Sequence, residues 1–270
     1  MNLRIPKRII QTHRSRDLPL LSKAAATNIK LLNPDFEYLF FDDKGVVEFI
    51  DQQFPEYRCI FDSFRYAISR YDFFRYLAIY HYGGFYLDLD VFLASSLSGL
   101  LDFDCVFPFE DLTINMFLRR KYGMDWEIGN YAFGAKAEHP FLKAIIRNCV
   151  KAQKDPDWVQ PMLRWVPRIF REGYYVLCTT GPGLISRTLA EYPAAAEEVK
   201  VLFPENVCDF AEWSRFGTFG VHLMKGTWRV RNGILWRRLY NIWLSRKEKR
   251  LFDESQRLGH RRSLEFRSIP

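Results

Sequence analysis

Apolar and polar residues follow two different periods along this chain, and the two periods predict helices and strands in turn. Where apolar residues recur every three or four positions, we expect helices, because that spacing gathers them on one helical face. The predicted helices span residues 18–32, 44–53, 64–82 and 140–153. Shorter apolar stretches bounded by turn residues indicate strands. The predicted strands span residues 5–12, 36–41, 85–91, 104–109 and 199–204, and a further strand follows Asn130.

Strands and helices alternate along the first half of the chain, and this order is typical of a mostly parallel sheet flanked by helices. The fold class expected is therefore α/β. Ligands of such sheets bind at the carboxyl ends of the strands. Residues 110–126 are polar and irregular in pattern, and we expect a flexible lip over a cleft there.

The stretch from residue 64 to residue 91 carries the most informative pattern. Gly83 and Gly84 follow the predicted helix directly, and glycine accepts the left-handed conformation that often ends a helix. In the strand that follows, alternation places Tyr86, Asp88 and Asp90 on one face. Two neighbouring carboxylates repel each other unless a cation lies between them. Oxygen ligands of this kind suit Mg²⁺ or Mn²⁺, which would also hold a diphosphate.

Asp72 and Arg75 lie three residues apart on the predicted helix and therefore share a face. In the functional interpretation, Asp72 binds sugar hydroxyls and Arg75 binds phosphate or sugar oxygens. The simpler alternative is a surface ion pair beside a strand edge that two aspartates keep soluble. Residues alone leave both interpretations open.

Seven positions at fixed spacing resemble the DXD region of glycosyltransferase family 32. They are Asp72, Arg75, Gly83, Gly84, Tyr86, Asp88 and Asp90. The resemblance implies the GT-A nucleotide-diphospho-sugar transferase fold and a cofactor of Mn²⁺ or Mg²⁺. It further implies metal-dependent, retaining transfer from a UDP- or GDP-sugar to a glycan or glycolipid acceptor hydroxyl. Polysaccharide, lipopolysaccharide or glycolipid synthesis is the expected setting.

Three further segments resemble parts of the same family. Residues 5–13 resemble its opening strand, although Ile10 and His13 stand where the family has His and Trp. Residues 130–140 and 179–183 resemble an Asn-containing strand entry and a Thr-Gly-Pro turn. Residues 220–228 resemble the closing segment, in which a histidine or acidic group often completes the metal site.

The resemblance assigns the site residues as follows. Metal ligands are Asp88, Asp90 and His222; catalytic residues are Asp72, Arg75, Asp90 and Asn130. Nucleotide-sugar contacts are Gln11, Thr12, His13, Asp72, Arg75, Gly84, Tyr86, Asp88, Lys225, Thr227 and Trp228.

The end of the chain is much more basic than the rest. The net charge is +7, yet residues 229–270 hold twelve Arg or Lys against four Asp or Glu, so the rest is nearly neutral. We therefore divide the chain into a catalytic domain, residues 1–228, and a basic amphipathic helical tail, residues 229–270. Such a tail is expected either to contact an anionic membrane or to form a solvated helix. Nucleic acid is not an expected partner.

The five cysteines are widely spaced and odd in number, as in buried thiols of a reducing compartment. No apolar signal region or run of about 18 apolar residues occurs in the sequence. We therefore expect a cytoplasmic enzyme, peripheral at the inner membrane face if the tail binds there. Two rival classes stay open: a metal-dependent hydrolase of nucleotide sugars, and a non-catalytic binding protein on the same fold.

Overall fold

The structure is a computed structural model that describes residues 4–113, 115–206, 209, 212–213, 215–223, 242 and 246. Apart from residues 242 and 246, the basic tail at 229–270 lies outside this range, and its predicted helix and its boundary stay predictions. Among the described residues, no helix is both long enough and apolar enough to cross a membrane.

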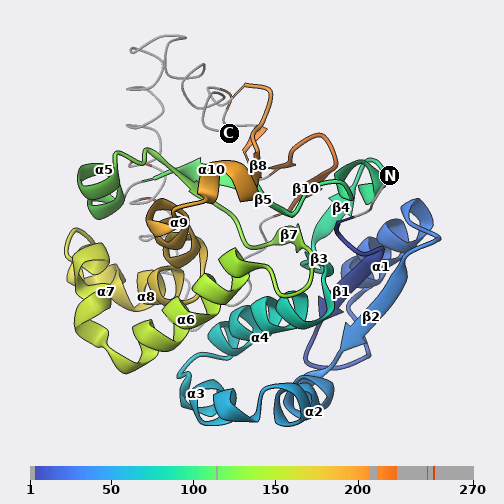
Figure 1. Cartoon of the computed structure of the whole chain (residues 1–270), viewed down its shortest axis with the longest axis horizontal. Helices are drawn as coiled ribbons and strands as arrows, with labels where there is room; N and C mark the ends of the chain where they lie inside the picture. Colours follow the sequence, from blue (N-terminus) through green and yellow to red (C-terminus); the bar gives the residue numbers. More distant parts are fainter. Residues whose placement is uncertain are drawn as a thin grey trace.

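A seven-stranded sheet forms the centre of the fold, in the order β2-β1-β3-β7-β5-β6, with β8 also paired to β5 (Figure 1). Its strands are β1 (Arg8–Thr12), β2 (Glu37–Phe41), β3 (Gly84–Leu87), β5 (Cys105–Leu112), β6 (Trp126–Ile128), β7 (Ala132–Ala135) and β8 (Lys200–Leu202). The pairs β1–β2, β1–β3 and β5–β8 are parallel, whereas β7 lies antiparallel to both β3 and β5. Strands β2, β1, β3, β5 and β8 therefore share one direction, and the mostly parallel α/β arrangement is confirmed.

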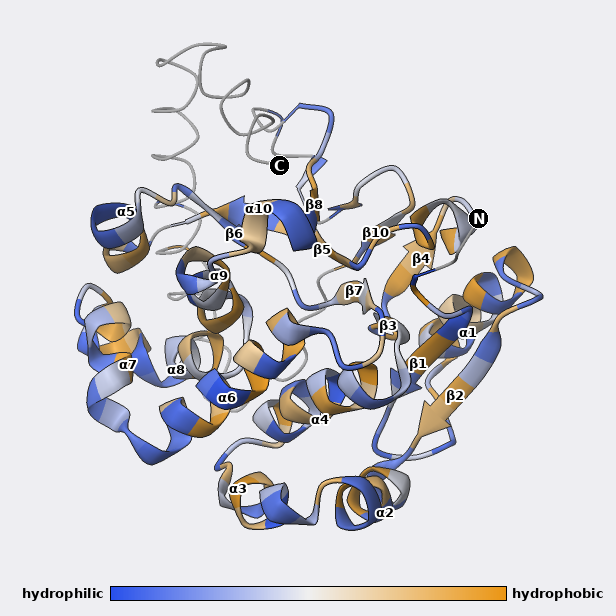
Figure 2. Cartoon of the chain, in the orientation of Figure 1, coloured by the Kyte–Doolittle hydropathy of each residue, from blue (hydrophilic) through white to orange (hydrophobic). Residues whose placement is uncertain are grey.

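Helices cover the sheet, and Figure 2 shows apolar residues gathered on the sides of helices that meet the core. The helices are α1 (Leu20–Leu32), α2 (Asp43–Gln53), α3 (Arg58–Ser63), α4 (Ala67–Tyr82), α5 (Met116–Tyr122), α6 (Pro140–Lys154), α7 (Pro156–Leu163), α8 (Arg171–Thr179), α9 (Pro182–Glu191) and α10 (Ala195–Glu198). Short 3₁₀ turns are η1 (Pro55–Tyr57), η2 (Leu97–Leu100) and η3 (Arg168–Phe170).

Helix α4 is buried on nearly all sides rather than along one stripe. Phe73, Phe74 and Leu77 are fully buried, and Asp72 and Arg75 keep only 3% of their surface exposed. A helix that is apolar all round is one that runs through a core. Asp72 and Arg75 are thus carried into the interior, which excludes the surface ion pair as their arrangement. Gly83 ends the helix with φ of 65°, as the sequence predicted.

A second, three-stranded sheet brings the end of the described chain back to the DXD segment. Its order is β4-β10-β9, from β4 (Val91–Leu93), β9 (Arg215–Phe216) and β10 (Gly220–His222). Strands β10 and β4 are antiparallel, with His222 opposite Val91. This pairing places His222 beside residues more than 100 positions earlier in the chain.

Two local predictions are wrong. The predicted strand 85–91 ends at Leu87, and residues 88–90 form a turn in which Val91 N donates to Asp88 O over 3.1 Å. Residues 110–126 do not form an irregular lip, because β5 continues to Leu112 and α5 and β6 follow. Leu112, Leu118 and Trp126 are buried there, so this segment is packed by apolar contacts that its polar pattern concealed.

Candidate active site

The turn that carries Asp88 and Asp90 is fixed by hydrogen bonds to its backbone. Gln11 on β1 is fully buried, and its Nε2 donates to Leu87 O over 3.0 Å. Its Oε1 accepts from the Tyr38 hydroxyl over 2.8 Å. Asp88 N donates to Tyr131 O over 2.7 Å. The carboxylates therefore extend from a backbone held on both sides, at the carboxyl end of a parallel strand.

Asp88, Asp90 and His222 converge at this turn. One ligand atom from each lies within 4.8 Å of the others. His222 Nε2 lies 3.3 Å from Asp90 Oδ1. The three side chains keep 27%, 21% and 15% of their surface exposed, so a ligand can reach them. The three predicted metal ligands are therefore brought together, although a turn rather than strand alternation brings the carboxylates together.

His222 is held in place from three directions. Its strand pairs with β4, and Leu223 N donates to Asp90 O over 3.0 Å. Its ring stacks on Tyr131, with centroids 4.3 Å apart and planes 16° apart. The Tyr131 hydroxyl in turn donates to Arg215 O over 2.8 Å. The imidazole is thus preoriented toward Asp90.

The electrostatics of this cluster fit a divalent cation. Burial raises the pKa of Asp88, and Asp90 adds to the rise, although Arg75 and His222 oppose it. Burial alone would lower the pKa of His222, but the hydrogen bond and charge of Asp90 raise it overall. A cation bound by the imidazole and both carboxylates would neutralise the two negative charges. The buried Nδ1 of His222 finds no hydrogen-bond partner in the described part of the chain. Two carboxylates and an imidazole are an acceptable donor set for Mn²⁺.

A second group of polar side chains lies in the interior beside this cluster. Asp72 Oδ1 accepts from Asn130 Nδ2 over 3.1 Å and pairs with Arg75 over 3.1 Å. Asp72 Oδ2 accepts from the Thr180 hydroxyl over 2.8 Å. Asn130 Nδ2 also donates to the Tyr76 hydroxyl over 2.9 Å. We call Asp72, Arg75, Tyr76, Asn130 and Thr180 the buried network.

Arg75 connects the buried network to the turn. One guanidinium nitrogen donates to Asn130 O over 2.7 Å and lies 3.3 Å from Asp88 Oδ1, while the other reaches Asp72. Tyr86 lies beneath the guanidinium, 4.5 Å from ring centroid to carbon, and its hydroxyl donates to Asp88 Oδ1 over 3.0 Å. Asp72 and Asp88 therefore share one positive charge.

Burial sets the protonation of the buried network. It raises the pKa of Asp72 to about 6, although Arg75 and the hydrogen bonds from Thr180 and Asn130 oppose the rise. Burial would lower the pKa of Arg75, but Asp88, Tyr86 and Asp72 together raise it, so the guanidinium stays charged.

The remaining predicted contacts are placed as follows. The Thr12 hydroxyl donates to Phe41 O over 2.8 Å at the end of β1, and His13 Nδ1 lies 3.0 Å from Ser15 O. Gly84 begins β3, at the opposite end from Asp88, and a Cβ there would meet Arg8 O at 2.6 Å. Close packing of β3 on β1 thus explains that glycine. Lys225, Thr227 and Trp228 lie outside the described residues.

Sequence reasoning missed two groups near the site. Tyr76 and Thr180 complete the hydrogen bonds of Asp72 and Asn130; the Thr-Gly-Pro turn was the signal available for Thr180. Glu110 lies where the β5–β6 register shifts, and a Cβ on Gly129 would meet its Oε2 at 2.2 Å. Its charge raises the pKa of His222 and Tyr131. Burial raises the pKa of its neighbour Glu127 to about 7, against the hydrogen bond from Thr113.

Parts of this chain are similar to known glycosyltransferases. Residues 21–107 match the family described as "Glycosyltransferase sugar-binding region containing DXD motif". Inositol phosphoceramide mannosyltransferase 2 of Schizosaccharomyces pombe is 30% identical over 205 residues, which cover 73% of this chain and 52% of that protein. Mannosyl phosphorylinositol ceramide synthase SUR1 of Saccharomyces cerevisiae is 34% identical over 142 residues, or 52% of this chain and 34% of that protein. The chain thus spans about half the length of the first relative and a third of the second.

Among solved structures, the PaToxG glycosyltransferase superposes with a TM-score of 0.48 at 13% identity, covering 72% of each chain. The UDP-bound glycosyltransferase domain of the YGT toxin gives a TM-score of 0.47 at 10% identity, over 74% of this chain and 80% of that one. Glycosyltransferases with a DXD motif generally bind a divalent metal ion, and the cluster described above has the ligands for one. Over residues 21–107, the chain is thus similar to glycosyltransferases that carry the DXD sugar-binding region.

Proposed function

We propose that this chain is a metal-dependent, retaining glycosyltransferase that moves a sugar from a UDP- or GDP-sugar to a hydroxyl group of a glycolipid head. The observation that carries the proposal is the continuous set of polar contacts from His222 and Asp90, through Asp88 and Arg75, to Asp72 and Asn130. One end of this set suits a cation with a diphosphate, and the other suits a sugar.

Asp88, Asp90 and His222 would hold the metal ion, and the imidazole favours Mn²⁺ over Mg²⁺. When bound, the ion supplies Lewis acidity that stabilises negative charge on the departing diphosphate. Arg75 adds a fixed positive charge on the same side, since it lies 3.3 Å from Asp88 Oδ1. Preoriented charge of this kind acts most strongly where water is excluded.

Asp72 is suited to orient the donor sugar. A carboxylate offers about four lone-pair sites. Asn130, Arg75 and Thr180 occupy three of them, which leaves one for a sugar hydroxyl. The three donors also fix the carboxylate rotamer, so the sugar is bound by an acceptor that does not move.

The same contacts make Asp72 a poor nucleophile, because its oxygens are engaged by Asn130, Arg75 and Thr180. We therefore favour displacement on a single face of the sugar. The acceptor oxygen bonds to the anomeric carbon as the bond from that carbon to the diphosphate oxygen breaks. The acceptor proton passes to the departing phosphate oxygen, and the anomeric configuration is retained.

The named relatives suggest the substrates. Their names specify mannosyl transfer and inositol phosphoceramide, so we propose mannose as the sugar and an inositol phosphate lipid as the acceptor. A lipid acceptor requires access to a membrane surface. We propose that the enzyme works at the cytoplasmic face of a membrane, where the basic residues of 229–270 meet anionic lipid.

A donor and metal panel tests the proposal. Purified protein is mixed with GDP-mannose, UDP-glucose, UDP-galactose or UDP-N-acetylglucosamine, with Mn²⁺, Mg²⁺ or EDTA, and with inositol phosphoceramide in detergent micelles. The true donor is expected to raise the melting temperature only with metal, by mass action, and to label the lipid.

Asp90→Asn is expected to reduce transfer by about 100- to 1,000-fold, the typical effect of losing a charge-stabilising group. Asp102→Asn removes an exposed carboxylate elsewhere and should leave transfer unchanged. If Asp90→Asn keeps full activity, the metal assignment fails. If the donor is hydrolysed without acceptor faster than lipid is labelled, the protein is a hydrolase instead.

A further inference from the structure

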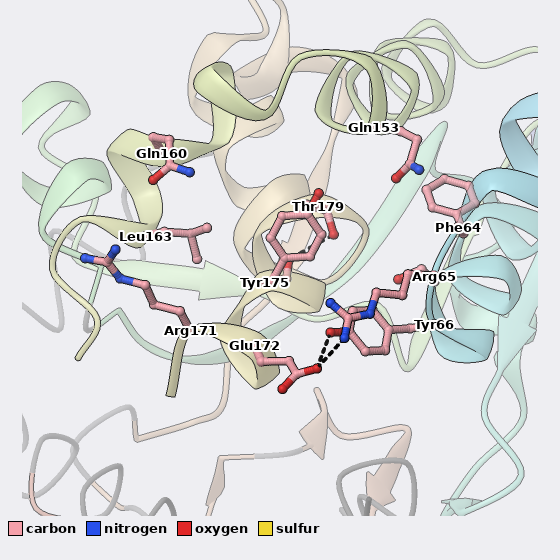
Figure 3. A pocket seen from close by; sticks show the side chains of 11 residues that line it. Phe64, Arg65, Tyr66, Gln153, Gln160, Leu163, Arg171, Glu172, Tyr175 and Thr179 are labelled. Carbon is pink, nitrogen blue, oxygen red and sulfur yellow. Dashed lines mark hydrogen bonds and ion pairs between the residues drawn. The ribbon is translucent and has the colours of Figure 1, made fainter. Parts of the chain in front are cut away.

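A cavity of about 540 Å³ lies beside the buried network, between the start of α4 and helix α8 (Figure 3). Ser69 and Thr179 lie among its lining residues and are 3% and 1% exposed. Ser69 is one helical turn before Asp72, a rise of about 4.5 Å along α4. Thr179 directly precedes Thr180, whose hydroxyl donates to Asp72. The cavity therefore adjoins the residue that we assign to the donor sugar.

The cavity also lies at the same edge of the sheet as the metal cluster. Helix α4 leads into β3, which ends at Asp88, so α4 runs opposite to the strand and begins near the strand's carboxyl end. The contact between Arg75 and Asp88 places the middle of α4 at the end of the strand, so the helix begins beyond that end. An acceptor seated in the cavity would thus approach a donor held at Asp72 and Asp88.

Charged and planar polar side chains line the cavity. Arg65 and Arg171 lie on opposite sides of Tyr175 (Figure 3). Arg65 pairs with Glu172 over 3.1 Å, and the Tyr66 hydroxyl donates to the same Glu172 oxygen over 2.8 Å. Arg171 Nε donates to Val166 O over 3.0 Å, which fixes its guanidinium. Gln153 and Gln160 add amide groups at the margin.

This lining matches an anion attached to a polyhydroxylated ring. Arginine forms charge-assisted hydrogen bonds with phosphate. Amide side chains and the Tyr175 ring suit hydroxyl groups and the apolar face of a cyclitol or sugar. Among the described lining residues, Glu172 is the one carboxylate, and it pairs with Arg65.

We propose that this cavity binds the phosphorylated polyol head group of the acceptor, and that the phosphate takes the place of Glu172 as the partner of Arg65. The proposal rests on the proposed function, because it names where the acceptor of that reaction binds. The lipid chains would extend from the open side of the cavity, and a ring hydroxyl would be directed past Ser69 and Thr179 toward Asp72.

If phosphate competes with Glu172 for Arg65, substitutions of these two residues should change the affinity for the ligand in opposite directions. Affinity for myo-inositol 1-phosphate is measured by calorimetry on the full chain without donor. Arg65→Gln is expected to weaken binding about fivefold, since the contact of a mostly exposed charge with phosphate is lost. Glu172→Gln is expected to tighten binding about threefold, because the competing carboxylate charge is removed while its hydrogen-bonding shape is kept. Equal effects of the two variants, or none, would overturn the proposal.

A variant that fills the cavity provides the second test. Gln160→Trp adds a bulky ring from an exposed position on α7, whereas Gln52→Trp makes the same change on the exposed surface of α2. Gln160→Trp should raise the KM for inositol phosphoceramide at least about tenfold and leave the KM for the donor unchanged. Gln52→Trp should change neither. An unaltered acceptor KM in Gln160→Trp, with the melting temperature retained, contradicts the assignment.

Two further arms identify the ligand chemistry. Inorganic phosphate alone and myo-inositol alone should each bind more weakly than their ester, whereas binding of phosphate as tightly as the ester would reduce the site to an anion site and refute a polyol pocket. Vesicles with and without phosphatidylinositol test the lipid form. If the ligand binds in the cavity but no sugar is transferred, the proposed function is wrong and the cavity assignment holds. If sugar is transferred but nothing binds in the cavity, the cavity assignment is wrong and the proposed function holds.

Discussion

The turn that carries Asp88 and Asp90 differs from the buried network in how far its carboxylates are exposed and paired. At the turn, Asp88, Asp90 and His222 stay partly exposed, and a buried imidazole nitrogen lacks a hydrogen-bond partner among the described residues. In the network, Asp72 is 3% exposed and accepts from three donors. The turn is therefore accessible to a ligand, whereas in the network both carboxylate oxygens of Asp72 already have protein partners and are shielded from solvent.

This difference separates two kinds of contribution to one reaction. Residues at the turn should matter chiefly for metal affinity and rate, with little effect on folding. Residues of the network should matter for stability as well, because removing one member leaves buried polar atoms unpaired. Each prediction below tests whether the turn contributes to metal affinity and rate while the network contributes to stability as well.

The largest effect is expected from Arg75→Gln. The substitution leaves the Asp72 carboxylate without its cation inside the core, and breaking a buried ion pair typically costs about 3–5 kcal/mol. Thermal or denaturant unfolding should therefore show a melting temperature about 10 °C lower. Arg58→Gln, which removes a partly exposed arginine paired with Asp51 and Asp62, serves as the control, and its melting temperature should shift far less. Equal shifts in both variants would mean that the network does not stabilise the fold.

His222→Gln should have a smaller effect, limited to the binding of the metal ion. Loss of the imidazole leaves two carboxylate ligands, so Mn²⁺ affinity should fall about tenfold or more, and the preference for Mn²⁺ over Mg²⁺ should narrow. Titration of transfer activity with each metal measures both quantities. His81→Gln, on the exposed end of α4, is the matched control. A large loss of melting temperature in metal-free His222→Gln would contradict the division between the two regions.

The smallest effect is a pH dependence. Burial raises the pKa of Asp72 to about 6, so below that pH the carboxyl is protonated in the folded protein and offers the sugar one fewer acceptor. The transfer rate should fall to about half near pH 6 and continue downward. Rates measured from pH 5 to pH 8 test this, with Asp72→Asn expected to lose the acidic limb along with most activity. An identical limb in the residual activity of Asp72→Asn would assign the titration to another group, such as Glu127.

The same shift has a defined sign for stability. The folded protein binds this proton more tightly than the unfolded chain does, because the pKa is raised on folding. The contribution of Asp72 to stability is therefore fully present below about pH 4 and is lost as pH rises through about 6.

Local pattern was sufficient to predict the parts of the site that lie close together in sequence. Helical spacing, a glycine pair and alternating residues located α4, Gly83 and β3, and the family motif added Asp88 and Asp90. The expected β-strand geometry at residues 88–90 failed, because a turn with a 3.1 Å hydrogen bond replaces alternation there. The two carboxylates do lie close together, as predicted, but a turn brings them together, whereas the pattern predicted strand alternation.

The other parts of the site depend on contacts between residues far apart in sequence, and these contacts could not be predicted from local pattern. Nothing near Asp72 in sequence indicates that Thr180 and Asn130 satisfy its oxygens, since those partners are 108 and 58 positions away. Residues 110–126 look polar because their buried apolar members are widely spaced, and only the packing of Leu112, Leu118 and Trp126 shows the segment to be ordered. The register shift that places Glu110 beside Gly129 is likewise a property of strand pairing and has no local signature.

The pairing of β10 with β4 has a consequence for how the protein is made. A ribosome releases Asp88 and Asp90 about 130 residues before His222, so a growing chain carries two of the three proposed metal ligands well before it gains the third. The nascent chain should therefore bind manganese weakly until β10 adds to the three-stranded sheet. Synthesis that stops short of residue 220 would yield a chain that carries α4, Asp88 and Asp90 but lacks the third proposed metal ligand, and we expect such a chain to be inactive.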